Sequence, residues 1–98
     1  MTVTQERNAD QLTLSIEGRV DSKTAPELEE ALRNALEGVK ALVIDLARTV
    51  YISSAGLRVL LMAQKQMDGQ GTLKLIHANH DLMEIFGVTG FTEILDIE

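Results

Sequence analysis

The chain has 98 residues, enough for a single domain over residues 1–98, because two independent cores of half this length would each bury too little surface. Hydrophobic residues make up 45% of the chain and charged residues 24%, which is ordinary for a folded domain and argues against disorder. The net charge of −6, with one tyrosine, two phenylalanines and no tryptophan, argues against nucleic acid, which selects Lys/Arg patches and stacking platforms.

Other kinds of site are excluded by what the chain lacks. The absence of cysteine excludes disulfides, thiolate metal sites and a cysteine nucleophile, and two histidines make a poor metal site. The longest apolar run, residues 41–44, is far below the roughly 20 residues that span a bilayer, and the N-terminus lacks the apolar core of a signal peptide. We therefore expect a cytoplasmic protein with no cofactor, no metal and no membrane contact, whose partner is another protein.

The first predicted element is a β-hairpin. Leu12, Leu14 and Ile16 alternate with polar residues, as in a half-buried strand. The polar residues 8–10 before them predict a turn, with a first strand over residues 2–7. The sheet is therefore expected to begin with an antiparallel pair.

An amphipathic helix follows, with a polar face that includes four glutamates. Thr24 and Glu27 stand at capping-box spacing, with Pro26 in the first turn, and Gly38 marks the end. The apolar stripe consists of Ala25, Leu28, Leu32, Ala35, Leu36 and Val39. The glutamates on the other side are most simply interpreted as a solvated helix face. Electrostatic steering of a partner is a secondary role.

The remaining elements alternate between strand and helix. Residues 41–44 are continuously apolar and are followed by Asp45 and Leu46, a short run typical of a central strand covered on both faces. Helices are predicted over residues 54–66 and 79–86, the latter closed by Gly87, with a strand over residues 72–76 between them. In the tail, the apolar residues expected to return to the core are Phe91, Ile94, Leu95 and Ile97. This order predicts an α/β fold: a mixed sheet of four to five strands with helices packed against it.

The strongest functional candidate is a serine at the start of the second helix. Ser53 and Ser54 precede an apolar-rich helical run, so one of them is the natural N-cap, and Ser54 fits best. At about 100° per residue, Arg58 and Lys65 project on nearly the same side as Ser54. The flanks of this serine face are Leu61 and Met62, and the core-facing arc holds Leu57, Val59, Leu60, Ala63 and Met67.

Such a face suits the docking of a protein, since apolar flanks supply affinity and a polar centre supplies discrimination. A phosphate on the serine would bring a charge of about −1.5 to −2 to a helix end that favours anions, so the fold would tolerate it. A docked partner would not, because a buried dianion must be paired or hydrated. Against this hypothesis stands the simpler interpretation that the serine is only a helix cap.

Residues 51–61, YISSAGLRVLL, resemble the signature of STAS domains, the family of bacterial anti-sigma factor antagonists. Residues 18–22 with 25–28 are similar to the family's first strand-to-helix junction, and residues 43–46 to its central strand. The resemblance covers essentially the whole chain, so residues 1–98 are identified as one STAS domain.

The resemblance implies a non-enzymatic partner switch. The unmodified antagonist would bind an anti-sigma serine kinase of the histidine-kinase-like ATPase type and release its client, and phosphorylation of Ser54 would block binding until a metal-dependent serine phosphatase removes the phosphate. Ser53 stands where the family commonly has an acidic residue, so Ser53 is the alternative phosphoacceptor. The residues expected to contact the partner are Asp21, Ser53, Ser54, Ala55, Gly56, Arg58, Leu61, Met62 and Lys65.

Two rival functions stay open at this point. A serine hydrolase would need a base and an acid converging on the serine, and the chain offers only His77, His80 and scattered aspartates without a Gly-x-Ser-x-Gly elbow. The other rival is a constitutive STAS scaffold that binds through the same face and is never phosphorylated. The serine hydroxyl at position 54 favours the switch.

Overall fold

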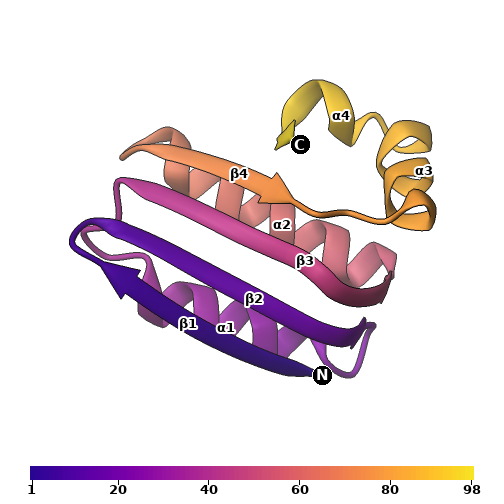
Figure 1. The fold of residues 1–98 in the computed structure, drawn as a ribbon, viewed down its shortest axis with the longest axis horizontal. Coiled ribbons are helices and arrows are strands. Elements are labelled where there is room, and N and C mark those ends of the chain that lie inside the picture. The colour runs from indigo at the N-terminus through magenta and orange to yellow at the C-terminus, as the bar shows by residue number, and fades with distance from the viewer.

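The computed structural model describes all 98 residues and shows one five-stranded sheet with two long helices packed on it (Figure 1). In chain order the elements are β1 (Thr2–Asn8), β2 (Gln11–Val20), α1 (Ala25–Ala35), β3 (Ala41–Ile52), α2 (Ser54–Asp68), β4 (Thr72–Ile76), α3 (His80–Val88), α4 (Phe91–Ile94) and β5 (Asp96–Ile97). None of the helices is long and apolar enough to cross a membrane.

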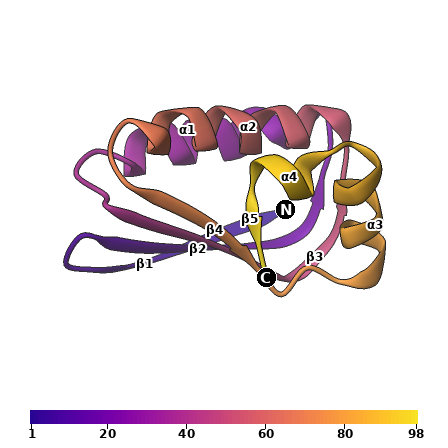
Figure 2. The same ribbon diagram turned by 90° about the horizontal axis from the view of Figure 1, so that it is seen from above.

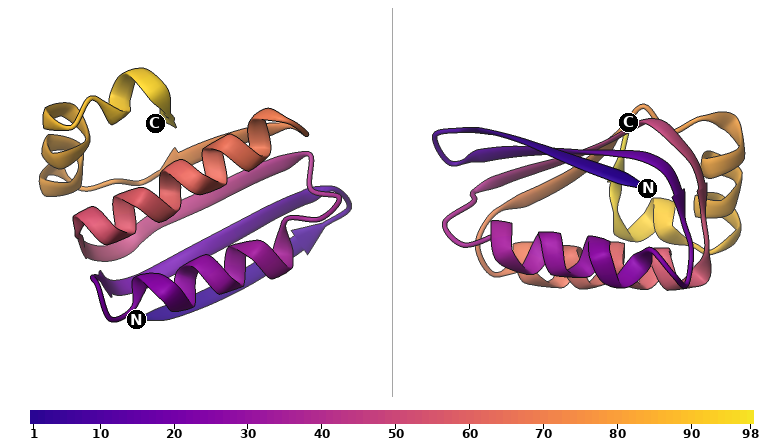
Figure 3. Two further views of the ribbon diagram at one scale, coloured as in Figure 1. Left: turned by 180° about the vertical axis from the view of Figure 1, so that it is seen from behind. Right: turned by 90° about the horizontal axis from the view of Figure 1, so that it is seen from below.

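The sheet is mixed, as predicted. Its strands follow the order β1-β2-β3-β4-β5; β1 pairs antiparallel with β2, and the other pairs are parallel. α1 and α2 lie side by side on one face of the sheet (Figures 2 and 3), and the opposite face carries no helix. The predicted hairpin, the central position of β3 and the α/β fold are therefore confirmed.

The prediction that the central strand is covered on both faces is wrong. Leu42, Ile44 and Leu46 are buried, whereas Val43 and Asp45, which alternate with them, are only half-buried. Because successive side chains of a strand point to opposite faces, this alternation matches helices on one face only. The strand also continues to Ile52, six residues beyond the predicted run.

Several predicted helix ends differ from the observed ones. α1 has Thr24 as its N-cap but no side-chain capping bond, so the expected capping box is absent. α1 ends at Ala35, and Gly38 serves a turn beyond it, with a left-handed φ of 77°. α3 runs through Gly87 to Val88, because a glycine without positive φ does not stop a helix; the left-handed glycine comes at Gly90.

The core consists of 23 buried hydrophobic residues, drawn from the inner face of the sheet and the inner sides of the helices. The predicted core arc of α2 is buried throughout: Leu57, Val59, Leu60, Ala63 and Met67. In the tail, Leu95 is buried, and Phe91 and Ile97 pack against the core. Ile94 was expected in the core but is 53% exposed, because the single turn of α4 directs it outward.

Candidate functional site

The carboxyl ends of β2 and β3 bring together three of the predicted site residues, Asp21, Ser53 and Ser54. Val20 pairs with Ile52 in the parallel register, and the backbone N–H of Ser53 donates to the Val20 carbonyl at 2.8 Å. Asp21 follows Val20 directly, so the loop before α1 and the start of α2 meet at one end of the sheet. The sequence places Asp21 and the two serines 32 and 33 positions apart, and the strand pairing makes them neighbours.

Ser53, and not Ser54, is the N-cap of α2, which corrects the expectation from the sequence. Ser53 has extended backbone angles, φ −84° and ψ 177°, and its Oγ accepts from the N–H of Gly56 at 3.5 Å. Its carbonyl accepts the first intrahelical bond, from the N–H of Leu57 at 2.9 Å. These features define an N-cap, so Ser54 is the first residue within the helix.

Ser54 is consequently free of a capping duty. It is exposed, whereas Ser53 is half-buried, and no hydrogen bond to the Ser54 hydroxyl is present in the structure. A hydroxyl at a helix start with solvent around it can accept a phosphoryl group without losing an internal bond. Ser53 therefore occupies a structural position, and Ser54 occupies an accessible one.

Gly56 fixes how closely the start of α2 approaches the sheet. It is buried, and a Cβ built there would lie 2.7 Å from Cγ1 of Val20 and 2.8 Å from Cγ2 of Ile52. Both contacts are shorter than carbon atoms tolerate, so the first turn of α2 can sit at this height only with glycine. Gly56 thus positions the serines and offers no side chain to a partner.

The exposed side of α2 has the arrangement expected from helical spacing. Ser54, Arg58 and Lys65 are exposed, and Leu61 and Met62 are half-buried beside them. We call these five residues the α2 stripe. Polar and charged groups run along its centre and apolar carbons flank them, which is the composition of a surface able to bind protein.

A groove of about 580 Å³ runs between the length of α1 and the first two turns of α2, and Arg58 of the α2 stripe lines it. Arg58 and Ala55 line it from α2, and Glu29, Glu30 and Arg33 line it from α1. Glu29 is paired with Arg33 at 2.8 Å. The glutamates of α1 were expected to form a solvated face. Their place beside Arg58 depends on the two helices being neighbours, which the sequence of either helix alone does not show.

Asp21 acts within its own loop. Its Oδ1 accepts from the N–H groups of Lys23 and Thr24, at 3.0 and 3.1 Å, and from the Thr24 hydroxyl at 3.2 Å. The backbone N–H groups of Thr24 and Lys23, in that order, hold the pKa of Asp21 below its ordinary value. The carboxylate organises the chain that enters α1, and its second oxygen carries no bond within the protein.

The histidines lie apart from Ser54. Nδ1 of His77 is 2.9 Å from Oδ1 of Asp45, and Asp45 pairs in register with Ile76. Ile52 stands seven residues further along β3, a rise of about 23 Å at roughly 3.3 Å per residue. Burial alone would raise the pKa of Asp45. The hydrogen bond from the N–H of Ala47 and the hydrogen bond and charge of His77 outweigh burial, so the pKa of Asp45 lies below its ordinary value. His80 is exposed and faces Glu84 at 4.0 Å. The His77 and Asp45 pair is therefore too far away to form a catalytic triad with Ser54.

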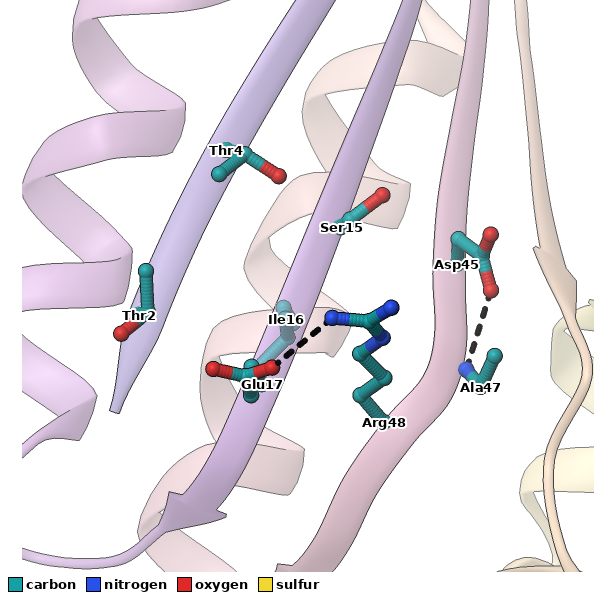
Figure 4. Close-up of a pocket in the computed structure, with 8 residues that line it drawn as sticks. All are labelled: Thr2, Thr4, Ser15, Ile16, Glu17, Asp45, Ala47 and Arg48. Atoms are coloured by element: carbon teal, nitrogen blue, oxygen red, sulfur yellow. Dashed lines mark hydrogen bonds and ion pairs between the residues drawn. The ribbon is translucent and has the colours of Figure 1, made fainter.

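A second hollow, of about 390 Å³, lies on the face of the sheet that carries no helix (Figure 4). Thr4 and Ser15 face each other across β1 and β2, and Arg48 forms an ion pair with Glu17 at 3.2 Å. The full lining is Thr2, Thr4, Ser15, Ile16, Glu17, Asp45, Ala47 and Arg48. None of these residues was predicted as a site residue, and none belongs to the α2 stripe. No group of three His, Asp or Glu side chains suited to a metal ion is present in the structure.

Comparisons with known proteins agree with this fold. The sequence model of the family described as "Mlab, STAS domain" matches residues 3–96. BtrV of Bordetella bronchiseptica is 36% identical over 99 residues, covering 99% of this chain and 85% of BtrV. The anti-sigma-B factor antagonist of Listeria monocytogenes is 34% identical, covering 96% of this chain and 84% of that protein. The crystal structure of an anti-sigma factor antagonist from Mycobacterium paratuberculosis superposes with a TM-score of 0.90 at 24% identity, covering 98% of this chain and 83% of that one.

Proposed function

The chain belongs to the STAS domain family, and we propose that it is an anti-sigma factor antagonist whose binding is switched by phosphorylation of Ser54. The unphosphorylated form binds an anti-sigma serine kinase of the histidine-kinase-like ATPase type in the cytoplasm and thereby frees the kinase's client. A metal-dependent serine phosphatase reverses the modification. The domain is not itself an enzyme, since its role is to present the acceptor and the surface around it.

The observation that carries this proposal is that the two serines have different structural positions. Ser53 caps α2, so Ser54 keeps an exposed hydroxyl without an internal partner, at the head of the α2 stripe. A residue that only capped the helix would have its oxygen on a backbone N–H, as Ser53 does. The position of Ser54 therefore favours acceptance of a phosphoryl group over a purely structural role.

The phosphoryl transfer needs a base from the kinase. Ser54 Oγ attacks the γ-phosphorus of ATP, the new Oγ–P bond forms, the bond to the β–γ bridging oxygen breaks, and ADP leaves. The hydroxyl proton goes to a carboxylate or similar base that the kinase supplies, because the His77 and Asp45 pair lies seven residues back along β3 from Ile52 and so away from the start of α2. In the reverse step, water attacks the phosphorus and the serine hydroxyl is restored.

The modification acts on the contact and leaves the fold in place. The first turn of α2 contains no acidic residue, so an added dianion meets free N–H groups and no like charge on its own helix turn. Across the contact the same dianion would be stripped of water beside Leu61 and Met62, at a cost that weakens binding. Phosphorylation thus releases the partner without unfolding the antagonist.

A constitutive scaffold is the second candidate function, because the α2 stripe could bind a protein whether or not Ser54 is modified. Partner affinity separates the two. A scaffold binds equally well with and without phosphate, whereas a switch loses affinity.

The test begins by capturing partners from a lysate on the purified chain and identifying a histidine-kinase-like ATPase among them. Binding of this kinase is then measured for the unmodified chain, for the chain carrying phosphoserine at position 54, and for Ser54→Asp. We expect the phosphoserine form to bind at least about tenfold more weakly, since removing the added negative charge from water at the contact costs roughly 1–3 kcal/mol or more. Ser54→Asp should fold and also lose affinity. Equal affinity of the phosphorylated and unmodified chains would favour the scaffold instead.

A further inference from the structure

Arg58 is an exposed cation without an ionic partner. The arginines at positions 33 and 48 are paired with Glu29 and Glu17, and Lys74 is paired with Glu98. Arg58 takes part in none of the ion pairs of the structure and in none of its side-chain hydrogen bonds. Its guanidinium is thus available to a new anion.

The acidic groups near Arg58 leave this charge largely uncompensated. Glu29 and Glu30 line the same groove from α1, and Glu29 is already held by Arg33 at 2.8 Å. The first turn of α2 has no acidic residue. Only Glu30 among the groove carboxylates is without an ion pair, and no contact joins it to Arg58.

Helix geometry directs Arg58 toward Ser54. The two residues stand four apart on α2, so their Cβ atoms are about 5–6 Å apart on one face. Side chains of a helix lean toward its N-terminus, so a long side chain at position 58 extends back over the turn that starts at Ser54. The flexible guanidinium therefore reaches the space that a phosphate on Ser54 would occupy.

We propose that Arg58 binds the phosphate of phosphoserine 54 within the same chain. This inference rests on the proposed function, because it describes the modified state of that switch. Arg58 lies in the middle of the α2 stripe, so the pairing also changes the surface that a partner meets: phosphorylation adds a dianion and withdraws the neighbouring positive charge in one step. Arginine suits this role, since its planar fork makes two parallel hydrogen bonds to phosphate oxygens.

The experiment titrates the phosphate in the absence of any kinase. Phosphoserine is installed at position 54 during translation of the full chain, and its second ionisation is followed by ³¹P NMR. The variants are Arg58→Gln, Arg58→Lys and, as the matched control on the same stripe, Lys65→Gln. Positions 58 and 65 are both exposed and lie outside the core, and the three unphosphorylated variants are compared with the wild type by circular dichroism.

We expect the second pKa of the phosphate in the wild type to be lower than in Arg58→Gln by about 0.2–0.4 units, which is what an i,i+4 ion pair supplies. Arg58→Lys should lie between the two, and Lys65→Gln should titrate as the wild type does. The difference should shrink in 1 M salt. Identical titration of Arg58→Gln and wild type, or an equal shift in Lys65→Gln, would overturn the proposal. The phosphate is installed without a kinase, so the titration does not depend on the proposed function. Failure of a kinase to modify Ser54 would count against the proposed function alone, and the effect of Arg58 on the phosphate would still be measured.

Discussion

At the scale of single residues, Ser53 and Ser54 differ in backbone conformation more than in chemistry. Ser53 is extended, caps the helix and is half-buried, whereas Ser54 is helical and exposed. Both are equally good capping residues by type, so the sequence cannot decide which one caps. The pairing of Val20 with Ile52 settles it, because the extended strand conformation persists through Ser53 and places the first helical residue at position 54.

This division predicts unequal effects on stability. Ser53→Ala should lower the free energy of unfolding by about 0.5 kcal/mol, the low end for a cap, because its bond to the Gly56 N–H is long at 3.5 Å. Ser54→Ala should change it by less than that, since no internal bond is lost. Urea unfolding at pH 7 measures both. A larger loss in Ser54→Ala than in Ser53→Ala would show that the capping assignment is reversed.

At the scale of elements, the contact between α2 and the sheet is set by a glycine. A methyl group at position 56 would meet Val20 and Ile52 at 2.7 and 2.8 Å, so the first turn of α2 would have to move away from β2 and β3. Sequence patterning predicted this helix and its buried arc correctly, because period and polarity are local properties. It could not show the role of Gly56, because that role depends on contacts with Val20 and Ile52, which are 36 and 4 residues away in the chain.

Gly56→Ala should therefore destabilise the protein by about 1–3 kcal/mol, the usual cost of overpacking. The matched control is Gly87→Ala within α3, where an added Cβ meets nothing within 4 Å. That control should be neutral or stabilise by up to about 1 kcal/mol, as alanine is the better helix former. Thermal unfolding compares the two. The account of the close approach fails if both alanine variants behave alike.

The junction between β2 and α1 gives a prediction for acid conditions. The pKa of Asp21 is lowered in the folded state by N–H donors of its own loop, so the carboxylate stabilises the fold above its unfolded pKa of about 4 and loses that effect as the pH falls through the lower folded value. Asp45 contributes in the same direction.

We expect the wild type to lose stability between pH 5 and pH 2, and Asp21→Asn to lose less over the same range, because asparagine keeps an acceptor oxygen but does not titrate. Asp10→Asn is the control, since the Asp10 side chain makes no hydrogen bond and the variant should follow the wild type. Urea midpoints across this pH range provide the measurement. An Asp21→Asn curve parallel to that of the wild type would contradict the assigned role.

At the scale of the whole molecule, the residues of the candidate site meet because the parallel strands β2 and β3 end at the same edge of the sheet. The order of the elements from β1 to α3 was predictable from alternating periods along the sequence, and so was the mixed sheet, whereas α4 and β5 lie in a tail whose pattern is too short and mixed to assign. The bare outer face of the sheet was not predictable, because the apolar run of residues 41–44 hides the alternation of buried and half-buried positions that the structure shows. The meeting of Asp21 with the serines and the groove between α1 and α2 depend on register, which the pattern of either element does not contain.

The central claim is that Ser54 is the phosphoacceptor, and phosphosite mapping tests it most directly. The captured kinase and ATP are incubated with the wild type, Ser53→Ala and Ser54→Ala, and the phosphopeptides are sequenced by mass spectrometry. We predict phosphate on Ser54 in the wild type and in Ser53→Ala, and none in Ser54→Ala. Phosphate confined to Ser53, or undiminished labelling of Ser54→Ala, would contradict the account.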